Sequence, residues 1–516
     1  MNYPNSKNRS RGVITVEMLI ALTIAVLTMT AVIGVVFGSQ SLGIDTETNQ
    51  EFGLLNQKLL EDARAQAKGN FNSSSSTPEN IVMIDGVETK QKLDVLDISQ
   101  CSKQIKSTIS WVNELRNQIV SLLNLVTDID ASEATGGECD PFPTTSDWDT
   151  PVSFESLTPG DIDGQGTGVA VSDIEDRRFA FLTTDEANPI KNNFWFIDTT
   201  DFDPGDSNSV NPSDIGSIKV GSEALNGIVV ANGYAYVITN KDTGQLVTIK
   251  VSANPLTTTP SIVASSTLQN ITGGIPKSIY YYDQKVFVGT GYVPCPVCAP
   301  ALNNEFHVYD VSTPSSPSWL YSIDVDRNVN DIFVRDGLAY LAVGPGSPPP
   351  PYDPMKIYDI DVTSPYFKDE KGHFETNLNE PATSLYLLGQ TLYLGLERAS
   401  SGDNFFVLDV ASSTNPQQVA WISTGDNTSE VGDILVRGSY AFLGMKNTGS
   451  LDAFQVWNVG DVTDADTFKR INVCNSGDPF PQNLTNMVYS DNLVFASFRS
   501  NKPFKIIYDT PAICVP

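Results

Sequence analysis

The longest apolar stretch of the chain runs from Val13 to Gly38 and holds one charged residue, Glu17. At about 1.5 Å rise per residue, a helix of this length reaches roughly 39 Å, enough to span a bilayer. A charge inside such a helix costs ~2.5–3.5 kcal/mol on insertion, so Glu17 is expected to serve a function. The pattern predicts an N-terminal hydrophobic helix that crosses the cytoplasmic membrane once.

The helical pattern continues beyond the apolar stretch. Over Ile44–Lys68, apolar residues at Phe52, Leu55, Leu59 and Ala63 recur every three or four positions, with charged residues on the other face. We therefore expect residues 13–69 to form one long N-terminal α-helix.

Residues 70–130 show a weaker and mixed pattern. Short strands are expected at Asn80–Ile84 and Leu93–Ile98, and helical spacing over Ser110–Val126 predicts a second amphipathic helix. Together these elements predict a small α+β head. Residues 131–165, rich in Gly, Thr, Ser, Asp and Pro, are expected to form a linker.

The rest of the chain repeats a pair of apolar strands seven times. Each repeat starts at a small or polar residue: Gly168, Gly227, Ser278, Asp331, Ser384, Asp433 and Asn486. A third strand follows in each repeat and ends at a polar residue: Asp198, Lys250, Asp310, Asp359, Asp409, Asn458 and Asp509. These ends lie 52, 60, 49, 50, 49 and 51 residues apart. A period near 50 with three or four strands per unit predicts a seven-bladed β-propeller over residues 166–516, in a chain that is mainly β.

A propeller must close its ring, because an open end strand exposes unpaired backbone groups. Two segments could supply the missing outer strand of the last blade: Pro511–Pro516, or Val152–Leu157 from the N-terminal side. A Cys474–Cys514 disulfide would hold the closure in either case.

The N-terminal residues resemble the prepilin leader of type IV pilins and pseudopilins. The matching residues are Arg11-Gly12 followed by VITVEMLIAL, with Glu17 as the fifth residue after Gly12. The resemblance implies that residues 1–12 are a leader peptide, removed by a prepilin peptidase between Gly12 and Val13, and that Val13 is N-methylated. It also implies that Glu17 pairs with the terminal amine of a neighbouring subunit during assembly. Val13 departs from the phenylalanine that the family usually has there, and an ordinary membrane anchor is the alternative.

The third strands of the repeats resemble a bacterial propeller family. Segments such as FHVYDVSTPSSP and FFVLDVASSTNP are similar to those of LVIVD-repeat proteins. The aspartates that end these strands are expected to form turns, because an aspartate side chain bonds backbone amides two residues further on.

The charge balance restricts the partners. With 32 basic against 61 acidic residues, the net charge is −29, which disfavours binding to nucleic acid or to anionic lipid head groups. Such acidity is typical of a soluble extracellular surface.

An even number of cysteines behind an export signal suggests disulfides. Sequence leaves the connectivity open, and proximity along the chain suggests the pairs Cys101–Cys139, Cys295–Cys298 and Cys474–Cys514. The CPVC segment at 295–298 also fits a redox motif or half of a zinc site, although the chain has no second CxxC.

Catalytic motifs are missing from the sequence, so we expect no enzyme activity, no cofactor and no metal. The two histidines are His307, expected within a strand, and His373, expected in a loop insertion; both are expected on the surface or in packing. The segment DIDGQGTG from Asp161 resembles a calcium loop but lacks its later acidic ligand. Two insertions, Pro294–Asn304 and Gly344–Asp353, lengthen equivalent turns of adjacent blades, where binding is often found.

The resemblance to type IV pilins, together with the propeller repeats, implies a type IV pilus subunit that carries a β-propeller on the cell surface for adhesion or for binding an unknown ligand. Its other expected partners are further pilin subunits, the prepilin peptidase and the inner membrane before assembly. The alternatives are a pseudopilin of a secretion system and a membrane-anchored propeller enzyme.

Overall fold

A computed structural model describes most of the chain from residue 51 to residue 509. The described residues are 51–72, 74–84, 86–113, 116–128, 131–132, 148, 151–154, 162–204, 212, 215–241, 245–251, 254–271, 273–294, 304–346, 353–376, 378, 380–397, 403–425, 429–446, 453–464, 467–471 and 483–509. They are mainly β, as predicted. The chain divides into two compact units. The first unit comprises the chain up to Gly69, together with Ser74–Val95 and Ile105–Asn124.

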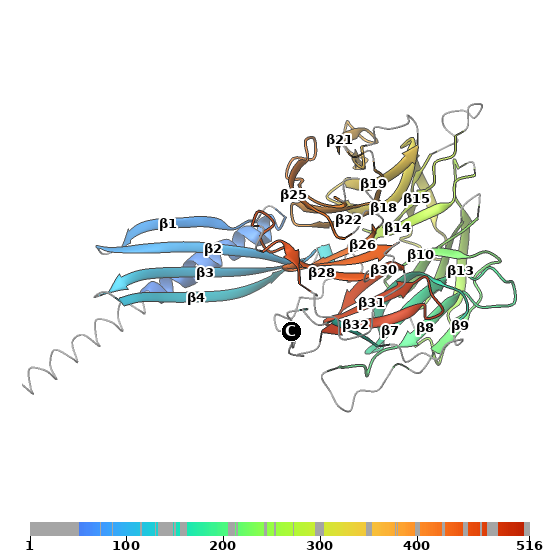
Figure 1. The fold of residues 1–516 in the computed structure, drawn as a ribbon, viewed down its shortest axis with the longest axis horizontal. Helices are drawn as coiled ribbons and strands as arrows, with labels where there is room; N and C mark the ends of the chain where they lie inside the picture. The colour runs from blue at the N-terminus through green and yellow to red at the C-terminus, as the bar shows by residue number, and fades with distance from the viewer. Residues whose placement is uncertain are drawn as a thin grey trace, which may run out of the picture. The chain divides into compact units, whose positions relative to one another are not determined.

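The first unit combines a helix over residues 51–69 with a four-stranded antiparallel sheet of order β1-β2-β3-β4 (Figure 1). The strands are β1 (Thr77–Ile84), β2 (Val87–Ser99), β3 (Ser102–Asn113) and β4 (Arg116–Thr127). Five helix residues are buried, at positions spaced three or four apart: Phe52, Asn56, Leu60, Ala63 and Ala67. Phe52 packs on Trp111 of β3 with ring centroids 4.4 Å apart, and the Asn56 amide donates to the Val120 carbonyl at 3.0 Å. The helix therefore covers one face of the sheet.

The second helix predicted over Ser110–Val126 is wrong, because β3 and β4 occupy this segment. In β3, side chains at every second residue are buried, including Ile105, Ile109 and Trp111. Apolar residues that are spaced three or four apart here also fit the alternation of a strand, and pairing with neighbouring strands decides between the two. The expected strands at Asn80–Ile84 and Leu93–Ile98 lie within β1 and β2.

The N-terminal expectations fall on residues 1–50, which lie outside the described residues; they include the cleavage site Gly12–Val13, the N-methylation of Val13 and the assembly role of Glu17. No helix among the described residues is long and apolar enough to cross a membrane. The predicted location, single-pass in the cytoplasmic membrane and then at the cell surface, is therefore corrected, since the described residues contain no such anchor. A long helix from residue 13 and a pilin-like head are not shown either.

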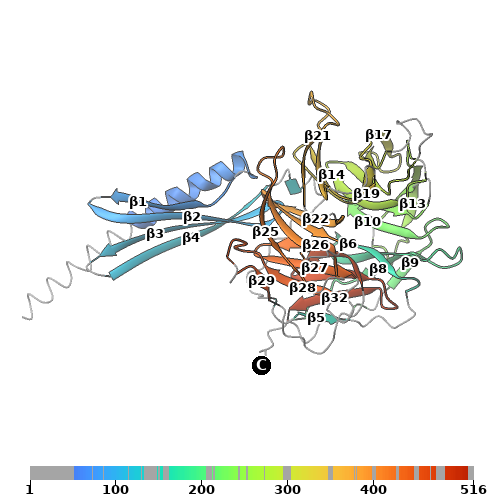
Figure 2. The ribbon, with the colours of Figure 1, turned by 45° about the horizontal axis from the view of Figure 1, so that its top comes forward.

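The second unit contains seven four-stranded antiparallel sheets, and each is a blade of a propeller (Figures 1 and 2). The strands of the first four blades are β6 (Gly166–Ile174), β7 (Arg177–Thr184), β8 (Phe194–Asp198), β9 (Ile215–Ile218); β10 (Leu225–Ala231), β11 (Tyr234–Thr239), β12 (Gln245–Lys250), β13 (Ser261–Thr267); β14 (Pro276–Tyr282), β15 (Lys285–Thr290), β16 (Phe306–Asp310), β17 (Ser318–Ile323); β18 (Arg327–Arg335), β19 (Leu338–Gly346), β20 (Met355–Asp359) and β21 (Glu370–Phe374).

The remaining blades follow the same plan. Their strands are β22 (Ala382–Leu388), β23 (Thr391–Leu396), β24 (Phe405–Asp409), β25 (Gln417–Ile422); β26 (Glu430–Arg437), β27 (Tyr440–Lys446), β28 (Phe454–Asn458), β29 (Lys469–Arg470); and β30 (Leu484–Ser490), β31 (Leu493–Phe498), β32 (Phe504–Asp509). The first strand of each blade contacts the first strand of the next, and β30 contacts β6, so the ring is closed. The seven repeats of the sequence are thus seven blades.

Ring closure uses the N-terminal of the two predicted segments. Strand β5 (Pro151–Phe154) pairs antiparallel with β32 as the outer strand of the last blade, with Tyr508 opposite Val152 and Ile506 opposite Phe154. This strand comes from a stretch that the sequence places in the linker. Trp148, just before it, is fully buried.

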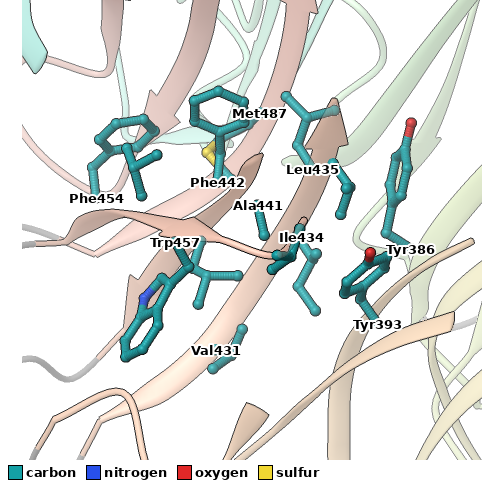
Figure 3. Packing of buried hydrophobic residues seen from close by; sticks show 14 of the residues in the cluster. Tyr386, Tyr393, Val431, Ile434, Leu435, Ala441, Phe442, Phe454, Trp457 and Met487 are labelled. Carbon is teal, nitrogen blue, oxygen red and sulfur yellow. The ribbon is translucent and has the colours of Figure 1, made fainter. Parts of the chain in front are cut away.

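Apolar side chains fill the spaces between blades. Figure 3 shows one such core, in which Phe442 of β27 and Met487 of β30 lie close to Leu435 and Ala441, while Tyr386 and Tyr393 of the preceding blade lie on the other side. Second strands such as β11, β23 and β27 present apolar residues to both neighbouring blades, which explains why they are almost continuously apolar.

The polar residues that end the third strands form the predicted turns. In five blades this side chain accepts a hydrogen bond from the backbone N–H two residues further on, at 2.8–3.1 Å: Asp198, Asp310, Asp359, Asp409 and Asn458. The expectation of turn formers is confirmed at these positions.

Candidate functional site

Every inner strand of the propeller carries a β-bulge near its start. One extra residue interrupts the pairing with the second strand in all seven blades: Thr167, Asn226, Lys277, Asn330, Thr383, Gly432 and Thr485. We call these the bulge positions, and the residue after each bulge the channel position. The channel positions are the residues at which the repeats of the sequence begin: Gly168, Gly227, Ser278, Asp331, Ser384, Asp433 and Asn486. Bulges re-aim side chains, which brings these two sets of residues together at the centre of the ring.

Polar residues at the channel positions join each blade to the next. The Asp331 carboxylate accepts from the Leu385 N–H at 2.9 Å, and the Asn486 side-chain oxygen accepts from the Val169 N–H at the same distance. The Asp433 carboxylate accepts from the Met487 N–H at 2.5 Å. Ser278 and Ser384 instead donate to a carbonyl of the following blade, at 3.2 and 2.8 Å. The small polar residue that opens a repeat is thus a link between blades.

Residues at the bulge positions add a second set of links. The amides of Asn226 and Asn330 each donate to a carbonyl of the next blade at 2.7 Å. The hydroxyls of Thr383 and Thr485 do the same at 2.5 and 3.1 Å. Gly432 has no side chain and cannot make this bond.

These residues line one cavity of about 840 Å³ at the centre of the propeller. All seven bulge positions and six of the seven channel positions contribute to its wall. Charged side chains of both signs also line it: Lys277, Asp331, Glu397, Glu430, Asp433, Lys446 and Arg499. Its size lies within the range typical of ligand sites, ~300–1,000 Å³, but its wall is polar rather than apolar.

Two carboxyl groups of the cavity, those of Asp331 and Asp433, have raised pKa values. Burial, and then the neighbouring charge of Asp331, raise the pKa of Asp433 to about 8, against the opposing effect of the Met487 N–H and Lys446. Burial raises the pKa of Asp331 to about 6, although the N–H groups of Leu385 and Ile332 favour its charged form. At neutral pH, Asp331 is therefore mostly charged and Asp433 mostly neutral.

The two lysines of the cavity have lowered pKa values, so their charged forms are also disfavoured. Burial lowers the pKa of Lys446, and the nearby Arg499 charge adds to this, while Glu430 and Asp433 oppose it. Burial also lowers the pKa of Lys277, with Glu397 opposing. A ligand that brings charge into the cavity would meet groups of both signs that are only partly solvated.

Gly432 makes room for Lys446. A Cβ at this bulge position would lie 2.5 Å from Lys446 Cε, and the lysine amine donates weakly to the Gly432 carbonyl at 3.4 Å. The glycine thus lets the Lys446 side chain lie across the inner strand of its blade.

The residues singled out from sequence lie mostly elsewhere. Cys101 is fully buried and disulfide-bonded, but its partner lies outside the described residues, so the pair with Cys139 stays a prediction. Cys295, Cys298, Cys474 and Cys514 also lie outside them, as do most residues of the two insertions.

The two histidines differ in their surroundings. His307 is fully buried in β16, where burial lowers its pKa to about 4. His373 lies in strand β21, not in a loop insertion as expected, and its side chain is 41% exposed. In the proposed calcium loop, Asp161 lies outside the described residues and Asp163 pairs with Lys191 at 2.8 Å.

Sequence reasoning missed the cavity, although it marked the channel positions as the starts of the repeats. The signal was available: Gly, Gly, Ser, Asp, Ser, Asp and Asn occupy one position in otherwise apolar strands. A polar residue repeated at one place in a buried strand faces the axis of the ring.

Comparisons with known proteins do not assign this chain to a family. No protein-family model and no curated protein matches this sequence. Among solved structures, the WD40 β-propeller domain of Doa1 is 10% identical with a TM-score of 0.46, covering 70% of this chain and 98% of that chain. The Cps50 (Swd1) β-propeller domain of Myceliophteria thermophila is 8% identical with a TM-score of 0.45, covering 70% and 100%. BamB from Moraxella catarrhalis is 13% identical with a TM-score of 0.37, covering 68% and 84%. The assignment as a propeller rests on the seven closed blades of this chain itself.

Proposed function

We propose that this chain is a pilin-like filament subunit whose propeller binds a polar peptide segment of a partner protein in its central cavity. The observation that carries the binding role is the convergence of all seven bulge positions on that cavity. It acts as a binding protein rather than an enzyme and needs no cofactor for this role.

The filament role is supported by the spacing of Gly12, Val13 and Glu17 in the sequence. The helix over residues 51–69 packed on a four-stranded sheet is compatible with the small head domain that this resemblance implies. A prepilin peptidase and further subunits are then the partners of the N-terminal segment. A pseudopilin shares all of these features and differs only in the filament that it enters.

Two measurements test the filament role. Mass spectrometry of the mature protein should find an N-methylated Val13 as its first residue. Glu17→Ala should reduce incorporation into filaments, because the carboxylate that pairs with the amine of a neighbouring subunit is lost. A mature protein that begins at Met1, or filaments that take up the variant as well as the native chain, would refute this role.

The peptide-binding role follows from the composition of the wall. Amide, hydroxyl, carboxylate and ammonium groups all line the cavity, and a peptide offers donors, acceptors and charges of both signs to match them. Because Lys446 and Asp433 are held in partly desolvated positions, bonds that they make to a ligand are stronger than those on an open surface.

An array of soluble polar peptides, probed with the full chain, tests this role. Lys446→Gln should abolish or weaken the spots that the native chain binds. Lys285→Gln is the matched control, because Lys285 pairs with Asp283 in an exposed turn outside the cavity. Spots that survive Lys446→Gln unchanged, or an array with no bound spots, would overturn the proposal.

Acid–base catalysis in the cavity is a second candidate, favoured by the raised pKa values of Asp331 and Asp433. Both carboxylates already accept two backbone N–H bonds each, which gives them a structural role. A panel of hydrolase and oxidoreductase substrates distinguishes the two functions, since an activity lost in Asp433→Asn would favour catalysis.

A further inference from the structure

Three side chains with metal-binding atoms meet at the edge of the fourth blade. Ligand atoms of Asp353, His373 and Glu375 all lie within 4.8 Å of one another. Asp353 stands just before β20, His373 lies in the neighbouring strand β21, and Glu375 follows directly after that strand. None of these residues lines the central cavity, so this group is independent of the proposed peptide site.

The backbone around the group is firmly held. Met355 pairs with Phe374 and Lys356 with His373 across the two strands. Phe374 is buried, and a Cβ at Gly372 would lie 2.4 Å from the Ser413 carbonyl of the next blade. Since alternate strand residues point to opposite faces, packing of residues 372 and 374 directs His373 and Glu375 outward together.

The histidine is oriented by a carboxylate that does not belong to the group. His373 Nδ1 lies 2.8 Å from Glu370 Oε1, and Glu370 is itself held by Lys356 at 2.9 Å. A metal-binding histidine usually donates its other ring N–H to such a carboxylate, which fixes the tautomer and leaves Nε2 free. Here Nε2 faces Glu375.

The spacing at Nε2 fits a tetrahedral ion. Two ligand atoms that are each ~2.1 Å from a tetrahedral zinc lie about 3.4 Å apart. His373 Nε2 and Glu375 Oε1 are 3.3 Å apart. A carboxylate oxygen of Asp353, at the adjacent strand end, lies within 4.8 Å of a ligand atom of each of these two residues.

We propose that Asp353, His373 and Glu375 bind a divalent transition-metal ion of the zinc class, with Glu370 as the residue that orients His373. The nitrogen ligand selects against calcium and magnesium, which take oxygen ligands. Three protein ligands leave one position open on the exposed edge of the blade. A carboxylate or water can fill this position.

Zinc binding by the metal-free full chain, kept oxidised, is measured by calorimetry and by metal analysis after gel filtration. We expect one zinc ion per chain, at least tenfold weaker binding in His373→Gln and Asp353→Asn, and no competition from calcium or magnesium. Glu175→Gln is the matched control, because Glu175 lies among carboxylates around a surface hollow that contains no histidine.

Histidine NMR gives a direct readout, because the chain contains two histidines. In protein labelled with ¹⁵N-histidine, zinc should shift the His373 imidazole signals, with Nδ1 still protonated, and leave those of buried His307 unchanged. Stoichiometric zinc binding that persists in His373→Gln, a zinc-induced shift at His307, or no shift at His373 would each overturn the proposal. So would equal displacement by calcium, which would indicate a cluster of carboxylates that attracts cations without a defined site.

Discussion

Asp433→Asn tests whether an ionisable side chain at a channel position opposes folding at neutral pH. The change keeps the size and shape of the side chain and removes its charge. Asn486 occupies the same position in the next blade, where its oxygen accepts from the Val169 N–H at 2.9 Å. An asparagine at 433 can therefore keep the link to the Met487 N–H.

The magnitude follows from the pKa of Asp433, which burial and the Asp331 charge raise from 3.8 to about 8. At 1.36 kcal/mol per pKa unit, this difference corresponds to roughly 6 kcal/mol. Because the side chain keeps partial contact with water in the cavity, we expect about half of this value, ~3 kcal/mol, as the destabilisation caused by ionised Asp433. The variant loses the bond that Asp433 accepts from the Ile434 N–H, worth about 1 kcal/mol. The net gain in the free energy of unfolding is ~2 kcal/mol.

The sign of the stability difference between Asp433→Asn and the native chain depends on pH. The folded chain holds a proton on Asp433 between pH 3.8 and about 8, so this contribution to stability is complete below 3.8 and is lost as pH rises through 8. Asp433→Asn lacks this loss. The variant should therefore be ~1 kcal/mol less stable than the native chain near pH 4 and ~2 kcal/mol more stable near pH 8.

Urea unfolding of both full-length proteins from pH 4 to pH 9 measures the difference. Asp331→Asn is the matched control, because burial raises the pKa of Asp331 only to about 6 and its gain should level off at a lower pH. A difference between Asp433→Asn and the native chain that does not change with pH would refute the assignment of a neutral Asp433.

Three further predictions address single residues or segments. Gly432→Ala should lower the free energy of unfolding by about 1–3 kcal/mol in thermal unfolding and change binding on the peptide array, because the added Cβ would lie 2.5–2.8 Å from Cε, Cδ and Cγ of Lys446 and force this side chain to move. Burial lowers the pKa of His307 to about 4, so the native chain loses stability as pH falls from 6.5 to 4. His307→Gln should therefore lose less stability than the native chain between pH 7 and pH 4.5, as measured by urea unfolding of both proteins. Deletion of Pro151–Phe154 exposes the edge of β32, so we expect a lower melting temperature and concentration-dependent association in gel filtration, and a monomer of unchanged stability would contradict closure by β5.

Local patterns in the sequence carried much of the propeller. Each third strand ends at the predicted residue, from Asp198 to Asp509. In five blades this end is an aspartate or asparagine turn, which depends only on bonds within two residues. The number of blades also followed from sequence, since each repeat is one sheet that must bury both of its faces against its neighbours.

Tertiary structure decided what local patterns left open. Apolar residues over Ser110–Val126 suit a helix and a strand, and only pairing between β3 and β4 selects the strands. Closure by β5 could not be chosen over the C-terminal tail, because both segments were short, apolar and close enough to β32.

The sequence by itself determined which residues occupy the repeated position, but only the tertiary structure brings them together into a cavity. Seven small or polar residues at one repeat position were visible as a pattern, yet only the closed ring brings Gly168 and Asn486, far apart in the chain, to one cavity. The same holds for Asp353 and His373, which strand pairing places side by side. Their chemistry depends on distances between distant residues, and those distances are set by packing of the blades.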